Sequence, residues 1–119
     1  MKLNILIFSI FLAFQACSPK ATTNTVVASA NEATETFIVA GNCNMCKKTI
    51  EGASKQAGAS YANWDKENDK LTVKFDKTKT SVDAIQKSIA KYGYDNVKYK
   101  ATNEAYEGLP ACCHYDRMQ

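Results

Sequence analysis

Two kinds of hydrophobic spacing alternate along residues 35–101, and their order limits the possible fold more than any other feature of the chain. Short β-branched or alternating runs, typical of strands, are separated by segments whose apolar residues recur at helical spacing. Strands are predicted at 36–40, 59–65, 71–75 and 96–100, and helices at 46–57 and 81–92. The order βαββαβ is the split βαβ, or ferredoxin-like, arrangement. We therefore predict an α+β sandwich with a four-stranded antiparallel sheet and both helices on one face.

Individual residues indicate which faces of these elements are buried. Ala62 and Trp64 share one face of the second strand, and the third strand alternates apolar with polar side chains. Ser81 is expected to cap the second helix, because its hydroxyl can accept a hydrogen bond from a backbone N–H of the first turn. The expected core therefore consists of the two strand faces and the helix stripes: Ile50, Ala53, Ala57, Ala62, Trp64, Leu71, Val73, Phe75, Val82, Ile85 and Ile89.

The first 34 residues are expected to lie outside this domain. An apolar run ending at Phe14 is about half of the ~20 residues that a membrane-spanning helix needs, but it suits a secretory signal. Phe14-Gln15-Ala16-Cys17 resembles the bacterial lipoprotein box, so residues 1–17 are predicted to be a lipoprotein signal with Cys17 lipidated. The alternative is ordinary cleavage nearby, which would release a soluble protein. Residues 18–34, rich in Ala, Thr, Ser and Asn, are predicted to be a flexible tether.

The chain has five cysteines in 119 residues, which is its one unusual compositional feature. With Cys17 lipidated, Cys43, Cys46, Cys112 and Cys113 remain. Outside the cytoplasm these four could form two disulfides in three possible connectivities. Together with the adjacent His114 they could equally be ligands for a soft metal ion.

Cys43 and Cys46 form a CxxC motif between the first predicted strand and the first predicted helix. This spacing places one sulfur in the loop and the other on the first helical turn, so that both can face one ion. The free N–H groups of a helix start favour negative charge and lower the pKa of a thiol there, and Lys47 and Lys48 add to that field. Two thiolates favour soft cations, Cu(I) first and then Zn(II), Cd(II) or Hg(II).

A βαββαβ frame with CxxC after its first strand resembles the heavy-metal-associated domain family, which includes copper chaperones, metal-pump modules and the periplasmic mercury-scavenging protein. The resemblance covers residues 35–101. It implies that Cys43 and Cys46 are metal ligands and that Tyr94, in Tyr92-Gly93-Tyr94-Asp95, belongs to the loop facing the metal. The family usually has Gly-Met-x-Cys-x-x-Cys, whereas Gly41-Asn42-Cys43 is one residue shorter and lacks the methionine.

Residues 102–119 form a tail that contains Cys112, Cys113 and His114, all candidate metal ligands. Adjacent cysteines rarely bond to each other, because the ring that they would close is strained. The 11 residues from Ala101 to Cys112 span at most about 36 Å, and the way back along one strand is about 17–20 Å. The tail can therefore reach the CxxC motif. Alternatively, it packs on the open face of the sheet and binds nothing.

These features predict a binding protein rather than an enzyme. The chain has one histidine, no phosphate-binding loop and no recognisable pair of carboxylates, and its net charge of +3 is too small to indicate nucleic acid binding. We expect a Cu(I)-binding scavenger or chaperone in the cell envelope, facing the periplasm or the exterior, with a metal-exporting ATPase or efflux complex as its partner. The alternatives are a thiol–disulfide redox protein and a Zn, Cd or Hg-binding accessory of an efflux system.

Overall fold

The sheet is antiparallel, and its strands follow the order β1-β3-β2. A computed structural model describes residues 30–119, in which the strands are β1 (Glu32–Ile38), β2 (Ala59–Asp65) and β3 (Lys70–Asp76). In the central strand, Leu71 pairs with Phe37 of β1 on one side and with Trp64 of β2 on the other. β1 begins four residues before the predicted start at residue 36, because it pairs with β3 along its whole length.

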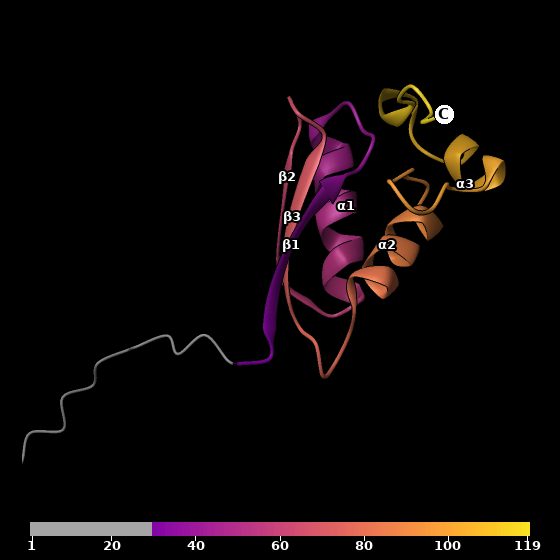
Figure 1. Cartoon of the computed structure of the whole chain (residues 1–119). Helices are drawn as coiled ribbons and strands as arrows, with labels where there is room; N and C mark the ends of the chain where they lie inside the picture. Colours follow the sequence, from indigo (N-terminus) through magenta and orange to yellow (C-terminus); the bar gives the residue numbers. More distant parts are fainter. Residues whose placement is uncertain (1–29) are drawn as a thin grey trace, which may run out of the picture.

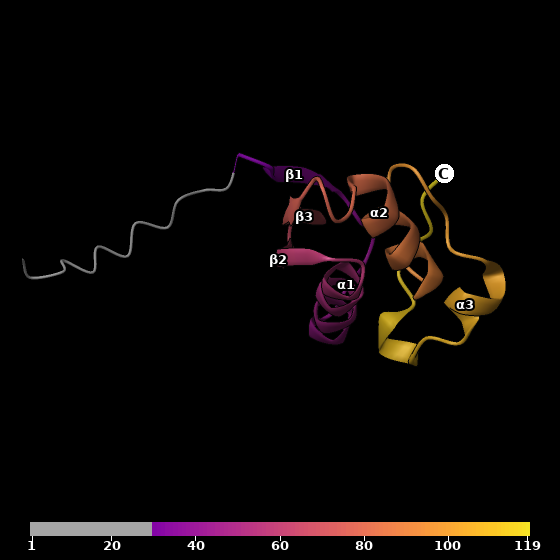
Figure 2. The same ribbon diagram turned by 90° about the horizontal axis from the view of Figure 1, so that it is seen from below.

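Both long helices, α1 (Asn44–Gln56) and α2 (Val82–Lys91), lie on the same face of the sheet, as expected (Figures 1 and 2). α1 begins two residues before the predicted start, because Cys43 caps it. The predicted cap of α2 is confirmed, since the Ser81 hydroxyl accepts a hydrogen bond from the Ala84 N–H at 3.1 Å. The capping side chains of Cys43 and Ser81 thus determine the residue at which each helix begins.

The predicted core lies between the sheet and the two helices. Trp64 is buried, and its indole Nε1–H donates to the Val39 backbone oxygen at 2.9 Å, so its one polar atom has a partner. The β3 side chains that alternate toward the helices are all buried, as are the central positions of both helix stripes: Leu71, Val73, Phe75, Ile50, Ala53, Ile85 and Ile89. This layer fixes the end of β1 relative to the start of α1, where the CxxC motif lies.

The predicted fourth strand at 96–100 is wrong: the sheet found among residues 30–119 has three strands. Asn96 makes only an isolated antiparallel bridge with Val39. Its side-chain oxygen accepts hydrogen bonds from the N–H groups of Lys98 and Tyr99, and its own N–H donates to the Tyr99 oxygen at 2.8 Å. These local bonds close a turn and take backbone groups that a strand would use for pairing. An asparagine at the start of a predicted strand was therefore a turn signal.

The tail contains a short helix, α3 (Asn103–Glu107), and one 3-10 turn, η1 (Ala111–Cys113). It returns to the end of the molecule at which α1 begins (Figure 1), and η1 contacts α1 there. The helical turn near residue 103 is capped by the Thr102 hydroxyl, which accepts from the Ala105 N–H. The C-terminal residues therefore pack beside the CxxC loop.

Two predictions concern residues that the structure does not describe. The lipoprotein signal with Cys17, and the tether up to residue 29, lie outside the described residues and stay predictions. Within residues 30–119, none of the helices is both long enough and apolar enough to cross a membrane.

Candidate metal centre

Cys43 and Cys46 lie where β1 gives way to α1. Cys43 is the N-cap residue of α1, and its Sγ accepts a hydrogen bond from the Cys46 backbone N–H at 3.2 Å. The two Sγ atoms are 2.8 Å apart, and Cys46 is completely buried. Because the capping thiol binds an N–H that has no partner inside the helix, the motif both starts α1 and directs two sulfurs to one point.

The tail brings a third sulfur to this pair. Cys113 Sγ lies 3.3 Å from Cys43 Sγ, although 70 positions separate the two residues. Cys113 is buried, whereas Cys112 is exposed, with its Sγ 3.8 Å from Cys113 Sγ. The sulfurs of Cys43, Cys112 and Cys113 all lie within 4.8 Å of one another, and these cysteines are free thiols, as is Cys46. The tail therefore reaches the CxxC motif, as its length allows.

Tyr94 forms the buried wall of this sulfur group. Its hydroxyl is buried and has no hydrogen-bond partner among the described residues. Burial raises the pKa of Tyr94 far above its usual range, and the facing sulfurs of Cys113 and Cys46 raise it further. Tyr94 therefore places a neutral hydroxyl beside the sulfurs, where the O–H can donate to a thiolate.

Buried hydrogen bonds hold the tail against the segment that follows α2. The Tyr115 hydroxyl donates to the Gly93 oxygen at 2.7 Å and accepts from the Asp95 N–H at 2.8 Å. The Arg117 guanidinium binds both carboxylate oxygens of Asp95, at 2.7 Å from Nε and 2.9 Å from Nη2. Gly93 has a φ of 102°, and a Cβ there would lie 2.8 Å from the Ala105 oxygen, so this close approach requires glycine. The third sulfur is thus held by an ordered segment.

The thiols of Cys43 and Cys113 differ in acidity. Burial alone would raise the pKa of Cys43, but hydrogen bonds from the Cys46 side chain and backbone outweigh it and lower the pKa to about 7. Burial raises the pKa of Cys113 to about 12, and its contact with Cys43 adds to the shift. At neutral pH Cys43 is therefore the more readily ionised thiol of the two, and Cys113 must release a proton when it binds a metal.

Known structures resemble this chain, although no family model and no curated protein sequence matches it. The chain is similar to the structure named CopZ metallochaperone, with 31% identity over 55% of this chain and 100% of that chain, and a TM-score of 0.52. The chain belongs to the heavy-metal-associated domain family. It is also similar to a proposed copper-ion-binding protein from Bacillus anthracis str. Ames, with 24% identity over 55% of this chain and 94% of that chain, and a TM-score of 0.51. A third similar structure is oxidized MerP from Ralstonia metallidurans CH34, with 31% identity over 54% of this chain and 94% of that chain, and a TM-score of 0.47.

The donors of this heavy-metal-associated protein fit a soft metal ion. Two sulfurs that bind one ion at about 2.3 Å lie no more than about 4.6 Å apart. The separations of Cys43 from Cys46 and from Cys113, 2.8 Å and 3.3 Å, are below this limit. The group offers sulfur donors, and thiolates select soft ions such as Cu(I) over hard ones such as Mg²⁺.

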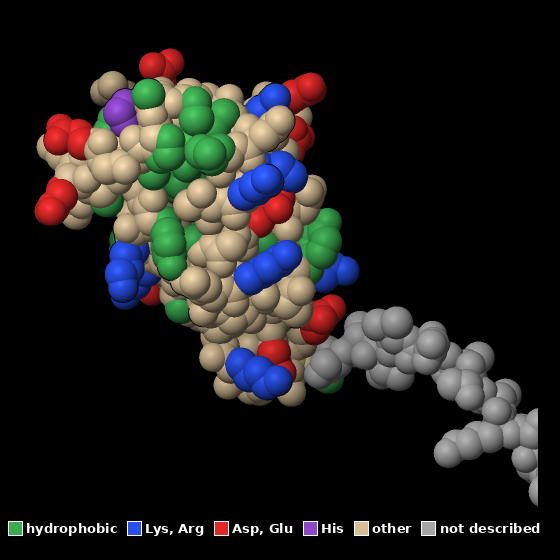
Figure 3. Space-filling model, turned by 180° about the vertical axis from the view of Figure 1, so that it is seen from behind, with side chains coloured by type: hydrophobic (Ala, Val, Ile, Leu, Met, Phe, Trp, Pro, Cys, Tyr) green, Lys and Arg blue, Asp and Glu red, His purple; other side chains and the backbone are tan. Residues whose placement is uncertain are grey.

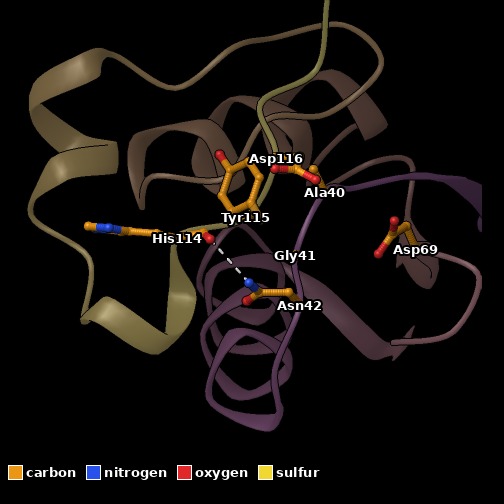
Figure 4. A pocket seen from close by; sticks show the side chains of 7 residues that line it. All are labelled: Ala40, Gly41, Asn42, Asp69, His114, Tyr115 and Asp116. Carbon is orange, nitrogen blue, oxygen red and sulfur yellow. Dashed lines mark hydrogen bonds between the residues drawn. The ribbon is translucent and has the colours of Figure 1, made fainter.

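Asn42 links the CxxC loop to the tail. Its Oδ1 accepts from the Cys46 thiol at 3.4 Å, and its Nδ2 donates to the His114 backbone oxygen at 3.1 Å (Figure 4). The pocket in Figure 4 lies beside this link and has no sulfur in its lining, so it is distinct from the sulfur group. The His114 ring stacks on Tyr106, with centroids 5.0 Å apart, and lies outside the group of sulfurs that the structure brings together. Its role as a ligand stays a prediction.

Several residues that shape this heavy-metal-associated site were not predicted from the sequence. Asn42 contacts the tail at His114 and Arg117 contacts Asp95, and contacts between residues so far apart leave no periodicity or spacing in the sequence. Met45 Sδ lies 3.9 Å from Cys112 Sγ. Its position inside CxxC was an available signal, because a thioether is itself a soft donor.

Proposed function

We propose that this protein binds one soft metal ion through Cys43, Cys46 and Cys113, with Cu(I) preferred, and acts as a scavenger or chaperone in metal transport. The observation that carries the proposal is the 3.3 Å approach of the buried Cys113 sulfur to Cys43. It adds a third, buried sulfur to the pair of thiols, which favours retention of the ion over rapid release. The similarity to a structure named CopZ metallochaperone supports the same function.

The proposed activity is binding rather than catalysis. Cys43, Cys46 and Cys113 are explained as donors, and Tyr94 and Asn42 as the groups that surround them. An accessory of an efflux system that binds Zn, Cd or Hg would use the same residues and would differ only in the ion. A metal-exporting ATPase or efflux complex is the partner that would receive the ion.

Thiol–disulfide exchange is a second candidate, and the sulfur distances favour it as a specific alternative. Cys43 Sγ is close to both Cys46 and Cys113, and its pKa of about 7 supplies a nucleophilic thiolate at neutral pH. This candidate predicts reversible disulfides with a physiological potential and no tight metal binding.

Metal preference tests the proposal most directly. Native mass spectrometry of the anaerobically purified, reduced protein, offered Cu(I), Zn(II), Cd(II) and Hg(II) together, should show one bound ion, with Cu(I) retained against a chelator. Cys113→Ser removes the third sulfur and keeps the rest of the tail, so we expect Cu(I) affinity to fall about 10- to 100-fold. A reduced protein that retains none of the four ions would refute metal binding, and equal affinity in Cys113→Ser would leave a two-cysteine site.

Attachment to a membrane through Cys17 is the proposed reason for an extracytoplasmic location. Several acyl chains on one residue hold a protein far more firmly than the marginal binding of one chain. The full-length protein should fractionate with membranes, and Cys17→Ala should move it to the soluble fraction. If the Cys17→Ala protein stays with the membranes, another segment holds it there.

A further inference from the structure

Five sulfur atoms form a row that runs from the buried site to the surface. In order they belong to Cys46, Cys43, Cys113, Cys112 and Met45, and successive atoms are separated by 2.8, 3.3, 3.8 and 3.9 Å. Cys46 and Cys113 are buried, at 0% and 1% exposed, and Cys43 between them is partly exposed. Cys112 and Met45, the latter 50% exposed, lie at the surface. We call Cys43, Cys46 and Cys113 the inner site, and Cys112 with Met45 the outer pair.

The outer pair comes from two different parts of the chain. Met45 lies on the first turn of α1, and Cys112 lies in η1, which contacts α1. Figure 3 shows hydrophobic side chains, a class that there includes cysteine and methionine, gathered on the end of the molecule that carries the histidine. A single exposed methionine is ordinary on a protein surface. Two exposed sulfurs that meet each other and continue a row of three others need a further explanation.

We propose that the outer pair is a relay through which a soft metal ion passes between the inner site and an external sulfur donor. This inference rests on the proposed function, because it concerns the path of the same ion. Two of the three inner cysteines, Cys46 and Cys113, are buried, so an ion held there leaves most readily if a new donor binds it before the old bonds break. The row supplies such donors at successive distances of less than 4 Å. The ion can therefore move outward without ever losing all of its ligands.

Each step of the relay is a ligand substitution that leaves the oxidation state unchanged. As the ion moves outward, the Cys112 thiol releases its proton to water and forms a bond to the ion, while a bond to Cys43 or Cys46 breaks and that thiolate regains a proton. The Met45 thioether then binds as a neutral donor, with no proton to lose. A neutral thioether binds soft ions more weakly than a thiolate does, so the ion is not held at the surface. Uptake follows the same steps in reverse.

The rates of uptake and release distinguish a relay from an additional resting ligand. Cys112 Sγ lies 3.8 Å from Cys113 Sγ and within 4.8 Å of Cys43 Sγ, but Cys112 is exposed whereas Cys113 is buried. Removing a donor that is used only on the path raises the barrier in both directions. Uptake and release should then slow by the same factor, and the affinity, which is their ratio, should change far less than either rate.

Stopped-flow transfer between the full chain and the Cu(I) chelator bicinchoninate measures both rates. The double variant Cys112→Ser, Met45→Leu keeps the size of both exposed side chains and removes both sulfurs, and we expect each rate to fall about tenfold or more. Cys112→Met restores a sulfur at that position, so it should recover most of the rate. Ala111→Ser adds a hydroxyl to the same exposed turn and removes no sulfur, so its rates should match the wild type.

The other outcomes overturn the relay in recognisable ways. Unchanged rates in the double variant would mean that the chelator takes the ion directly from Cys43. Faster release with a matching loss of affinity would make Cys112 a resting ligand instead. If equilibrium titration of the wild-type protein with Cu(I) shows no tight binding, the proposed function fails and the relay fails with it. Tight binding by the wild type together with unchanged rates in the double variant refutes the relay alone.

Discussion

Replacing either Cys43 or Cys46 with serine should lower the Cu(I) affinity about a thousandfold, or about 4 kcal/mol, because each thiolate supplies a large share of a soft ion's binding free energy. Serine is itself a good N-cap residue, so Cys43→Ser should keep the start of α1 intact. In Cys46→Ser the Asn42 oxygen that now accepts from the thiol can accept from the new hydroxyl. A loss of binding would therefore report the sulfur rather than the fold.

Competition with a Cu(I) chelator at neutral pH, under anaerobic conditions, measures this effect. Asn44→Ser is the matched control, because it changes an exposed residue between the two cysteines and removes no sulfur. Circular dichroism should show all three variants folded. Wild-type affinity in either cysteine variant would mean that the ion is bound elsewhere.

Arg117→Ala should cost about 3–5 kcal/mol of folding stability, because it leaves the carboxylate of Asp95 buried without its counter-ion. The Asp95 side chain is completely buried, while that of Arg117 is 27% exposed. The other hydrogen bonds of this carboxylate, from the N–H groups of Ala101 and Met118, do not neutralise its charge. We expect the tail to leave the domain first and to take Cys113 with it.

Two measurements separate release of the tail from global unfolding. Urea denaturation gives the free energy of unfolding, and the rate at which a thiol reagent modifies Cys113 under native conditions reports exposure of the tail. Lys100→Ala removes an exposed cation nearby and should change neither value. The double variant Asp95→Asn, Arg117→Ala should be less unstable than the sum of the two single variants, since it leaves no buried charge. Additive losses would show that the two side chains stabilise the tail independently.

The cost of Arg117→Ala should also depend on pH. Burial alone would raise the pKa of Asp95, but the guanidinium of Arg117 outweighs it and holds the pKa below its usual range. A carboxyl with a depressed pKa stabilises the folded state above its unfolded pKa of about 3.9, and this contribution is lost as the pH falls through the folded value. Without Arg117, burial raises the pKa of Asp95 above its usual range, so the difference in stability between wild type and Arg117→Ala should be complete at neutral pH. It should begin to shrink as the pH falls through this raised pKa, and should stop shrinking below the depressed pKa of the wild type.

The sequence predicted those parts of the fold that local chemistry determines. The alternation around Val73 identified the buried face of β3, and the hydroxyl of Ser81 identified the start of α2. CxxC was expected at a helix start, and Cys43 is the cap itself. The prediction of a fourth strand failed because the side chain of Asn96 accepts hydrogen bonds from nearby backbone N–H groups. Hydrophobic spacing in the sequence does not reveal this competition.

The CxxC part of the site could be predicted from the sequence, but the arrangement of the tail residues around it could not. Length alone indicated that Cys112, Cys113 and His114 could reach the CxxC motif. Only the conformation of η1 determines that Cys113 points inward while Cys112 is exposed and the His114 ring stacks on Tyr106. The segment that follows η1 is held by the contact between Arg117 and Asp95, which are 22 positions apart and have no pattern in common.

An ion bound by both Cys43 and Cys113 would act as a cross-link across most of the domain. A link between Cys43 and Cys46 closes a loop of three residues and constrains the unfolded chain very little, whereas a link to Cys113 spans 70 positions. By the loop-entropy relation used for disulfides, closing a loop of that length disfavours the unfolded state by about 4 kcal/mol. Metal occupancy and resistance to unfolding then become one linked equilibrium, since the ion binds this site only when the tail is folded. The lifetime of the protein in the presence of proteases would consequently follow the local supply of the metal.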